Sequence, residues 1–192
     1  MTTLTTLSRI FLMVLNVTGI SSTAIAVAQP APSATLQAAT IPAAQSQITL
    51  DQALVIANKA VKGEVIGVEF EQGNNRAGDE YEVNIIAQGH EYDVNISATT
   101  GKVLSIEQEV LDAEDVAEYN VMKQARITLT QALEQATQTI NGTVVEAEFD
   151  GDHGKSDYKI DVVQGAQLHK IVIDSMTGAL ITNPIKDAHK VV

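Results

Sequence analysis

The sequence predicts an α+β protein made of two copies of one small domain, each a helix followed by a three-stranded antiparallel sheet. Two observations support this prediction. The stretch that begins at Ile127 nearly repeats the one that begins at Ile48, and 11 of 25 positions agree between 48–72 and 127–151. In each copy the apolar residues change from helical spacing to strict alternation. A period of about 80 residues is too long for a solenoid, so each copy is read as a domain.

The first 46 residues precede the repeats. Residues 1–28 have the pattern of a secretory signal: Arg9, then an apolar run over 10–17, then small residues that end at Ala28. Polar residues dilute this run, which argues against a stable membrane anchor once the signal is cleaved. Residues 29–46 contain no charge and are rich in Ala, Pro, Thr, Ser and Gln, which predicts a flexible linker. The mature protein is expected to be periplasmic or secreted.

The chain is acidic, with 24 Asp and Glu against 12 Lys and Arg and a formal net charge of -12. Such a charge repels phosphate backbones and anionic lipid surfaces, so nucleic acid and membrane surfaces are excluded as partners. Basic partners are favoured instead. The chain has no cysteine, so an exported domain of this kind has to be stabilised by its cores and by packing between the repeats.

The first repeat is assigned to residues 47–108 and opens with a helix. Thr49 and Gln52 have the spacing of a capping box, in which each side chain bonds the backbone of the other residue. A single apolar stripe follows at helical spacing, formed by Leu50, Leu54, Ala57 and Val61. Gly63 is expected to end the helix.

Three alternating segments after the helix predict strands. Their core-facing residues are expected to be Ile66, Val68 and Phe70, then Tyr81, Val83 and Ile85, then Tyr92, Val94 and Ile96. The link Gln88-Gly89 predicts a two-residue hairpin that pairs Ile85 with Tyr92, and the next pairs in this register are also apolar. After the turn at Thr100-Gly101, Val103-Leu104 is expected to form only a short return segment.

An acidic linker at 109–125 joins the repeats. Val116, Tyr119 and Met122 are spaced for one face of a short helix. A solvated helix is favoured over a cation site, because the carboxylates lack the spacing of a known metal loop. The second repeat, at 126–185, retraces the first, and residues 186–192 form a tail.

The order of these elements, found twice, resembles the PepSY domain of peptidase propeptides and exported bacterial proteins. The sharpest match is a turn in which Asp174 precedes Thr177-Gly178; in the first copy Ser97 replaces the acid before Thr100-Gly101. A carboxylate there can accept backbone N–H bonds, so its role is read as structural. The resemblance implies a non-catalytic module that inhibits or regulates peptidases.

Reactive groups are sparse, and neither a catalytic residue nor a cofactor is predicted. His169 is read as a packing residue opposite Val162, since the facing positions are aliphatic. The loop at 150–157 is the best metal candidate, but an ordinary turn is favoured because the pattern of a calcium loop is incomplete. Its weak candidate ligands are Asp150, Asp152, His153 and Asp157.

One face of each sheet is left without a helix, so its residues are candidates for binding. In the first repeat this face is polar and is expected to stay hydrated; it holds Glu69, Glu80, Glu82, Asn84, Glu91, Asp93 and Asn95. In the second repeat, Val163, Leu168 and Val172 lie beside a predicted Asp161–Lys170 pair. These apolar residues predict either a partner surface or a contact with the first repeat or the linker helix.

Two functions follow from these observations. The favoured one is an exported, non-enzymatic module that binds a protein or peptide, and modulates a peptidase or another envelope protein through a sheet face or edge. The alternative is an acidic periplasmic protein that captures cations.

Overall fold

The computed structural model of this chain describes residues 47–73, 78–151, 154–182 and 189–190. The predicted signal at 1–28, the linker at 29–46 and most of the tail lie outside these residues. The elements are α1 (Leu50–Ala60), β1 (Glu64–Glu71), β2 (Glu80–Ala87), β3 (His90–Ser97), β4 (Val103–Val110), α2 (Ala113–Met122), α3 (Leu129–Thr139), β5 (Thr143–Asp150), β6 (Asp157–Gln164), β7 (Gln167–Asp174) and β8 (His189–Lys190). No helix in these ranges has the length and apolarity needed to cross a bilayer.

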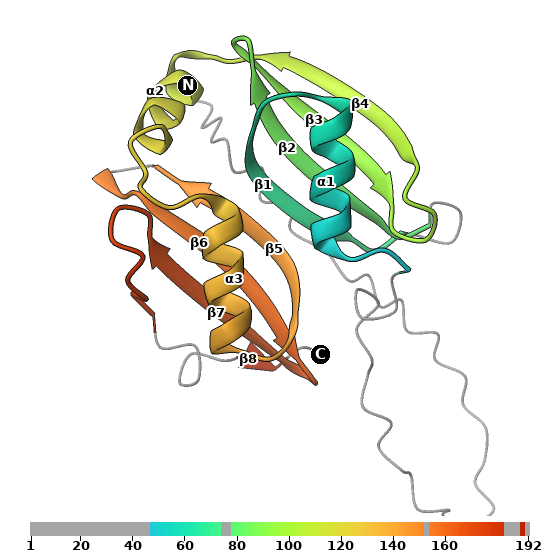
Figure 1. Cartoon of the computed structure of the whole chain (residues 1–192), viewed down its shortest axis with the longest axis vertical. Coiled ribbons are helices and arrows are strands. Elements are labelled where there is room, and N and C mark those ends of the chain that lie inside the picture. Colours follow the sequence, from blue (N-terminus) through green and yellow to red (C-terminus); the bar gives the residue numbers. More distant parts are fainter. Residues whose placement is uncertain (1–46, 74–77, 152–153, 183–188, 191–192) are drawn as a thin grey trace, which may run out of the picture.

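The two repeats share one antiparallel sheet of eight strands, in the order β4-β3-β2-β1-β5-β6-β7-β8. The repeats meet where β1 pairs with β5, and Val68 there lies opposite Ala147. Figure 1 shows α1 and α3 on the same side of this sheet, each over the strands of its own repeat. The predicted α+β fold with two repeats is confirmed, and the repeats are joined edge to edge.

Both repeats begin with the predicted capping box. The Thr49 hydroxyl accepts a bond of 3.3 Å from the Gln52 amide, and the Gln52 side chain accepts one of 2.9 Å from the Thr49 amide. Thr128 and Gln131 form the same two bonds at the same distances. These bonds satisfy N–H groups that a helix start otherwise leaves without a partner. The equivalence shows why the two sequences start their helices at corresponding residues.

The predicted hairpin register is confirmed, since Ile85 pairs with Tyr92, Val83 with Val94 and Tyr81 with Ile96. The equivalent hairpin of the second repeat pairs Val162 with His169. The apolar members of both hairpins point toward the helices and form the core. A shift by one residue would expose this whole set, so burial fixes the register.

The prediction of three strands is wrong for the first repeat, because β4 continues for eight residues along β3. In β4, Ile106 and Val110 alternate with Glu107 and Glu109, a pattern that fits one apolar and one acidic sheet face. The second repeat has no strand of that length among the described residues after β7. There, Leu180 forms a single bridge with Ile173, and the short β8 pairs with the start of β7.

A β-bulge in β1 corrects one predicted orientation. The register passes from Val65 opposite Ile85 to Gly67 opposite Asn84, so one extra residue, Ile66, lies between them. The bulge places Val65, rather than Ile66, in the helix-side pair with Ile85. Ile66 is 7% exposed and instead lines a cleft on the other face, below α2.

Gly63 does not end the helix in the predicted way. α1 ends at Ala60 with Val61 as an extended cap residue. A Cβ atom on Gly63 would lie 2.5 Å from both Ile85 Cγ2 and the Ile86 carbonyl oxygen. The glycine is therefore required by the close approach of the chain to β2.

The linker helix α2 is less solvated than its composition predicts. Glu118 is 6% exposed, and its carboxylate accepts a bond of 2.8 Å from the Gly151 amide at the end of β5. Met122 is also buried, whereas Val116 is exposed. A carboxylate bonded to a backbone amide therefore attaches α2 to the second repeat.

Replacing Glu118 with alanine is expected to lower the free energy of unfolding by about 1 kcal/mol, because the partly buried Gly151 amide loses its acceptor. Urea denaturation of the purified chain measures this change. Glu118→Gln retains an acceptor oxygen and should cost less. Glu134→Ala, at an exposed position of α3, is the matched control, and an equal loss in both alanine variants would contradict the role of the bond.

Candidate binding face

The face of the sheet opposite α1 and α3 carries a continuous row of acidic residues. Glu82, Glu69, Glu146 and Asp161 lie directly opposite one another on β2, β1, β5 and β6. The row ends at Lys170 on β7. Like charges in directly opposed positions destabilise a sheet, so this arrangement is unfavourable for the isolated fold. We call this surface, with the neighbouring acids on β3 and β4, the acidic face.

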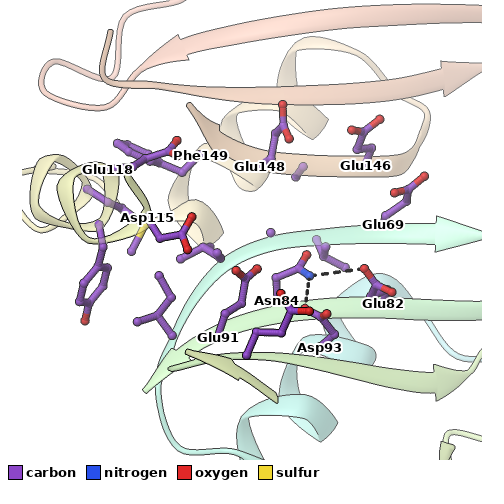
Figure 2. A pocket seen from close by; sticks show the side chains of 18 residues that line it. Glu69, Glu82, Asn84, Glu91, Asp93, Asp115, Glu118, Glu146, Glu148 and Phe149 are labelled. Atoms are coloured by element: carbon purple, nitrogen blue, oxygen red, sulfur yellow. Dashed lines mark hydrogen bonds between the residues drawn. The ribbon is translucent and has the colours of Figure 1, made fainter. Parts of the chain in front are cut away.

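A second row runs parallel to the first. It joins Glu107, Asp93, Asn84, Gly67, Glu148 and Lys159 across six strands. The Asn84 amide donates bonds of 2.9 Å to Asp93 and 3.4 Å to Glu82 (Figure 2). In the first repeat, an uncharged amide therefore bridges two carboxylates of neighbouring strands.

The second repeat supplies lysines to its own acids. Lys170 lies 2.7 Å from Asp161, as the sequence predicted, and Lys159 lies 3.3 Å from Glu148 and 2.8 Å from Asp150. The ion pairs between residues that the structure describes all lie in the second repeat. The acidic face consequently has its positive charge at one end and an excess of carboxylates over the first repeat.

Crowding of these carboxylates changes their proton affinity. Burial, followed by repulsion from Glu146 and then other acids, raises the pKa of Glu69 to about 7. The pKa values of Glu82 and Glu146 are also raised, in both cases chiefly by burial. Both effects disfavour the charged form, so a cationic group placed on this face would relieve an existing electrostatic cost.

A cleft opens in the acidic face where α2 covers the junction of the repeats. Figure 2 shows Glu69, Glu146 and Glu148 on its sheet side and Asp115 and Glu118 on its helix side. Its volume is about 90 Å³. This is below the roughly 300–1,000 Å³ of sites that enclose small ligands, so the cleft fits a protruding side chain better than a cofactor.

The predicted apolar surface of the second repeat is partly covered. Val163 is 7% exposed, while Leu168 and Val172 are half-buried. The chain after β7 runs beside them: the Val172 amide donates to Thr182 Oγ1 at 2.9 Å, and β8 pairs with Leu168. Asp161 and Lys170 complete this surface.

The turn after β7 shows what its acidic residue does. Asp174 Oδ1 accepts bonds from the Met176 amide at 3.1 Å and from the Thr177 amide and hydroxyl at 2.7 Å each. Gly178 follows with φ 71°. In the first repeat, the Ser97 hydroxyl accepts from the Thr100 amide at 3.2 Å, and Gly101 has φ 68°. Both turns need glycine at the positive φ, but the carboxylate makes more bonds.

Asp174→Ala is expected to lower the thermal midpoint more than Ser97→Ala does. The hydrogen bonds from Thr177 lower the pKa of Asp174, so its stabilisation is present above the ordinary pKa of 3.8 and is lost as the pH falls through the lower folded value. Thermal scans at pH 7 and at a pH below the lowered folded value measure the difference. Equal losses for the two variants at pH 7 would contradict this role of the carboxylate.

Of the weak metal candidates, Asp150 and Asp157 lie opposite each other on β5 and β6. Asp150 is bound by Lys159, and by Lys155 at 3.3 Å, while Asp157 lies opposite Asp174. Asp152 and His153 lie outside the described residues. Within those residues, no group of three His, Cys, Asp or Glu side chains could hold a metal ion. His169 is 4% exposed and lies opposite Val162, in the predicted packing position.

Sequence reasoning missed Glu148 and Glu146, which β5 adds to the acidic face. Glu148 is the counterpart of Glu69 at an offset of 79, so the internal repeat contained a signal for it. Glu146 corresponds to Gly67 at the same offset and had no such signal. Its position beside Glu69 depends on the pairing of β1 with β5, which the local sequence does not specify.

Comparisons with known proteins agree with the repeat. The family described as "Peptidase propeptide and YPEB domain", PepSY, matches residues 47–107 and again 126–182. A crystal structure from Clostridium difficile 630, described as a "putative lipoprotein", is 25% identical, with 76% of this chain and 94% of that chain covered and a TM-score of 0.44. No curated protein matches. The predicted resemblance to a tandem PepSY protein is confirmed by the two family matches.

Proposed function

Because this chain belongs to the PepSY family, we propose that it is an exported, non-catalytic binding module that inhibits or otherwise modulates a peptidase or another cell-envelope protein. The observation that carries the proposal is the acidic face, which has its excess of carboxylates over the first repeat. The partner is a protein or peptide with a basic surface. The mature protein, without residues 1–28, acts in the periplasm or outside the cell.

The arrangement of the sheet supports this proposal. Among the described elements, α1 and α3 lie on one side of the shared sheet, and α2 is the helix that covers part of the other side. Glu69, Glu82 and Glu146 repel one another there, and a partner's lysines or arginines would replace that repulsion with attraction. Electrostatic complementarity of this kind gives specificity and fast association.

The second repeat provides a further proposed contact. Leu168 and Val172, next to the buried Val163 and the Asp161–Lys170 pair, form a small apolar surface with a polar border. Binding surfaces commonly combine an apolar centre with a charged rim. A partner that spans both repeats would therefore meet acids on the first repeat and apolar side chains on the second.

The experiment is affinity capture followed by a functional assay. The mature chain, immobilised, is expected to retain a basic envelope protein that is released at about 0.5 M salt, where surface charges are screened. A triple variant, Glu69→Gln, Glu82→Gln and Glu146→Gln, should lose this protein. The control neutralises Asp51 and Glu134 on the helix side. The purified partner, if it is a peptidase, should change its rate when the module is added.

The same protein tests the alternative function. Dialysed mature chain is heated with and without Ca²⁺ or Zn²⁺. A rise of the thermal midpoint at micromolar metal, together with the absence of a retained protein, would replace the proposed function by cation capture.

A further inference from the structure

We propose that the free edge of β4 binds an extended segment of the partner in which apolar and basic residues alternate. This inference rests on the proposed function, because the segment belongs to the protein that the module binds. The segment would continue the sheet beyond β4 as a ninth strand, next to Val103–Val110. Addition of a strand to a sheet edge gives affinity through backbone bonds and specificity through alternate side chains.

No other described strand pairs with this edge along its length. All eight residues of β4 are exposed, and β4 pairs only with β3 among the described strands. The exposed side chains include Val103, Leu104, Ile106 and Val110, the last at 73%. The opposite edge of the sheet differs, since the segment after β7 bonds to it through Ile181 and through β8. Thus β4 is the edge with room for another strand.

The hydrogen bonds of β4 reveal which backbone groups face outward. The Leu111 amide donates to the Gly89 carbonyl at 3.2 Å, and the register places Val110 opposite His90. In an antiparallel pair, bonded and non-bonded residue pairs alternate. The odd-numbered residues Glu109 and Glu107 therefore bond to β3. Ile106, Gln108 and Val110 direct their N–H and C=O groups toward the free edge.

The side chains of β4 define the sequence that would fit beside it. Ile106 and Val110 lie opposite Val94 and His90, on the helix side of the sheet. Glu107 and Glu109 lie opposite Asp93 and Glu91, on the acidic face. A segment paired with β4 would place its side chains beside these residues in turn. Apolar residues would pack on the helix side, and lysine or arginine would meet the glutamates.

A second copy of this chain fits the edge poorly. Pairing of β4 with β4 would extend the acidic face of one molecule into that of another, and each chain has a net charge of -12. Charged residues on an edge strand are a common means of preventing self-association. The same glutamates that repel a second copy attract a basic segment, so the edge is selective by charge.

The probe is a synthetic peptide of about eight residues that alternates valine and lysine, a length that matches β4. Binding to the mature chain is followed by fluorescence anisotropy. Two control peptides have the same length: one groups all lysines at one end, and the other replaces lysine with glutamate. The alternating basic peptide is expected to bind at least about tenfold more tightly than either control, because only it satisfies both faces.

Backbone recognition is tested on both partners. Ile106→Pro removes an outward N–H but no bond to β3, and proline is tolerated on strand edges. It should weaken peptide binding about tenfold, whereas Ile106→Val should not. Two further peptides carry N-methyl groups on every second backbone nitrogen, one at the odd positions and the other at the even positions. One of these peptides should lose binding, and the other should retain it. This second measurement does not depend on how the variant folds.

Each outcome decides between explanations. Equal binding of the alternating and grouped peptides would assign recognition to the acidic face and overturn the role of the edge. If sedimentation velocity shows a dimer of the wild type that Ile106→Pro converts to monomer, the edge of β4 binds a second copy of this chain. That result would also overturn the proposed binding of a partner segment. Retention of the envelope partner by both wild type and Ile106→Pro would leave the proposed function standing without this inference. Loss of partner retention in wild type would contradict the proposed function itself.

Discussion

Replacing Gly142 with alanine is expected to lower the free energy of unfolding by about 3 kcal/mol, a large effect for an exposed residue. A Cβ atom there would overlap the carbonyl oxygen of Val163 and would lie 2.7 Å from Val162 Cγ1. Both atoms belong to β6, which is held between β5 and β7, so the strand cannot move away without breaking its ladders. Chemical denaturation of the purified chain measures the loss.

Gly78 provides the matched control, because a Cβ atom there has nothing within 4 Å. Gly78→Ala should leave stability almost unchanged. Gly63→Ala should behave like Gly142→Ala, since Gly63 makes the equivalent approach to β2 in the first repeat. If Gly142→Ala and Gly78→Ala had the same stability, the close approach would not be what requires glycine at the start of β5.

The local architecture of each repeat was predictable because short-range signals specify it. A capping box needs only Thr49 and Gln52, three residues apart. The β2–β3 hairpin needs a two-residue turn and apolar partners in one register, of which Val83 opposite Val94 is an example. These signals lie within a few residues of the structure that they determine, and no knowledge of the other repeat is required.

Features that depend on contacts between distant segments were not predictable in this way. The pairing of β1 with β5 brings Glu69 beside Glu146, although like charges would argue against that pair. Ile66 does not lie on the helix side because it is the extra residue of a β-bulge. Nothing in the residue type of Ile66 distinguishes it from the regular strand residues around it, so the bulge was not predictable. The sequence predicts only a short return segment in place of β4, because the pattern of this strand becomes clear only when β3 supplies the neighbour of Ile106.

Part of the candidate binding face could be read from alternation alone. Glu82 and Asp93 were expected on the helix-free side, since strand residues alternate between faces. The bias of charge between the repeats was not foreseen. The sequence predicts the Asp161–Lys170 pair, but it does not predict that Lys159 lies beside Glu148 on the neighbouring strand. The distribution of charge on this face therefore depends on how the strands pair in the sheet.

Removing the charge of Glu69 is expected to stabilise the protein in a pH-dependent manner. The folded chain holds this carboxyl at a pKa of about 7, against an ordinary value of 4.5. Between these values the folded state retains a proton that the unfolded state releases, so its stability falls as the pH rises through this window. Above pH 7 the charged group carries the full cost, while below pH 4.5 both states are protonated and the cost is absent.

Glu69→Gln should therefore raise the free energy of unfolding by about 2 kcal/mol at pH 8 and by about 0.5 kcal/mol at pH 5, after allowance for solvent screening of this half-buried group. Urea denaturation at the two pH values measures both gains. The matched control, Glu107→Gln, neutralises an exposed acid of the same face and should change stability little at either pH. A gain of equal size at pH 5 and pH 8 would mean that the variant improves packing and not electrostatics. That result would contradict the claim that repulsion among the carboxylates of this face favours the binding of a cationic partner.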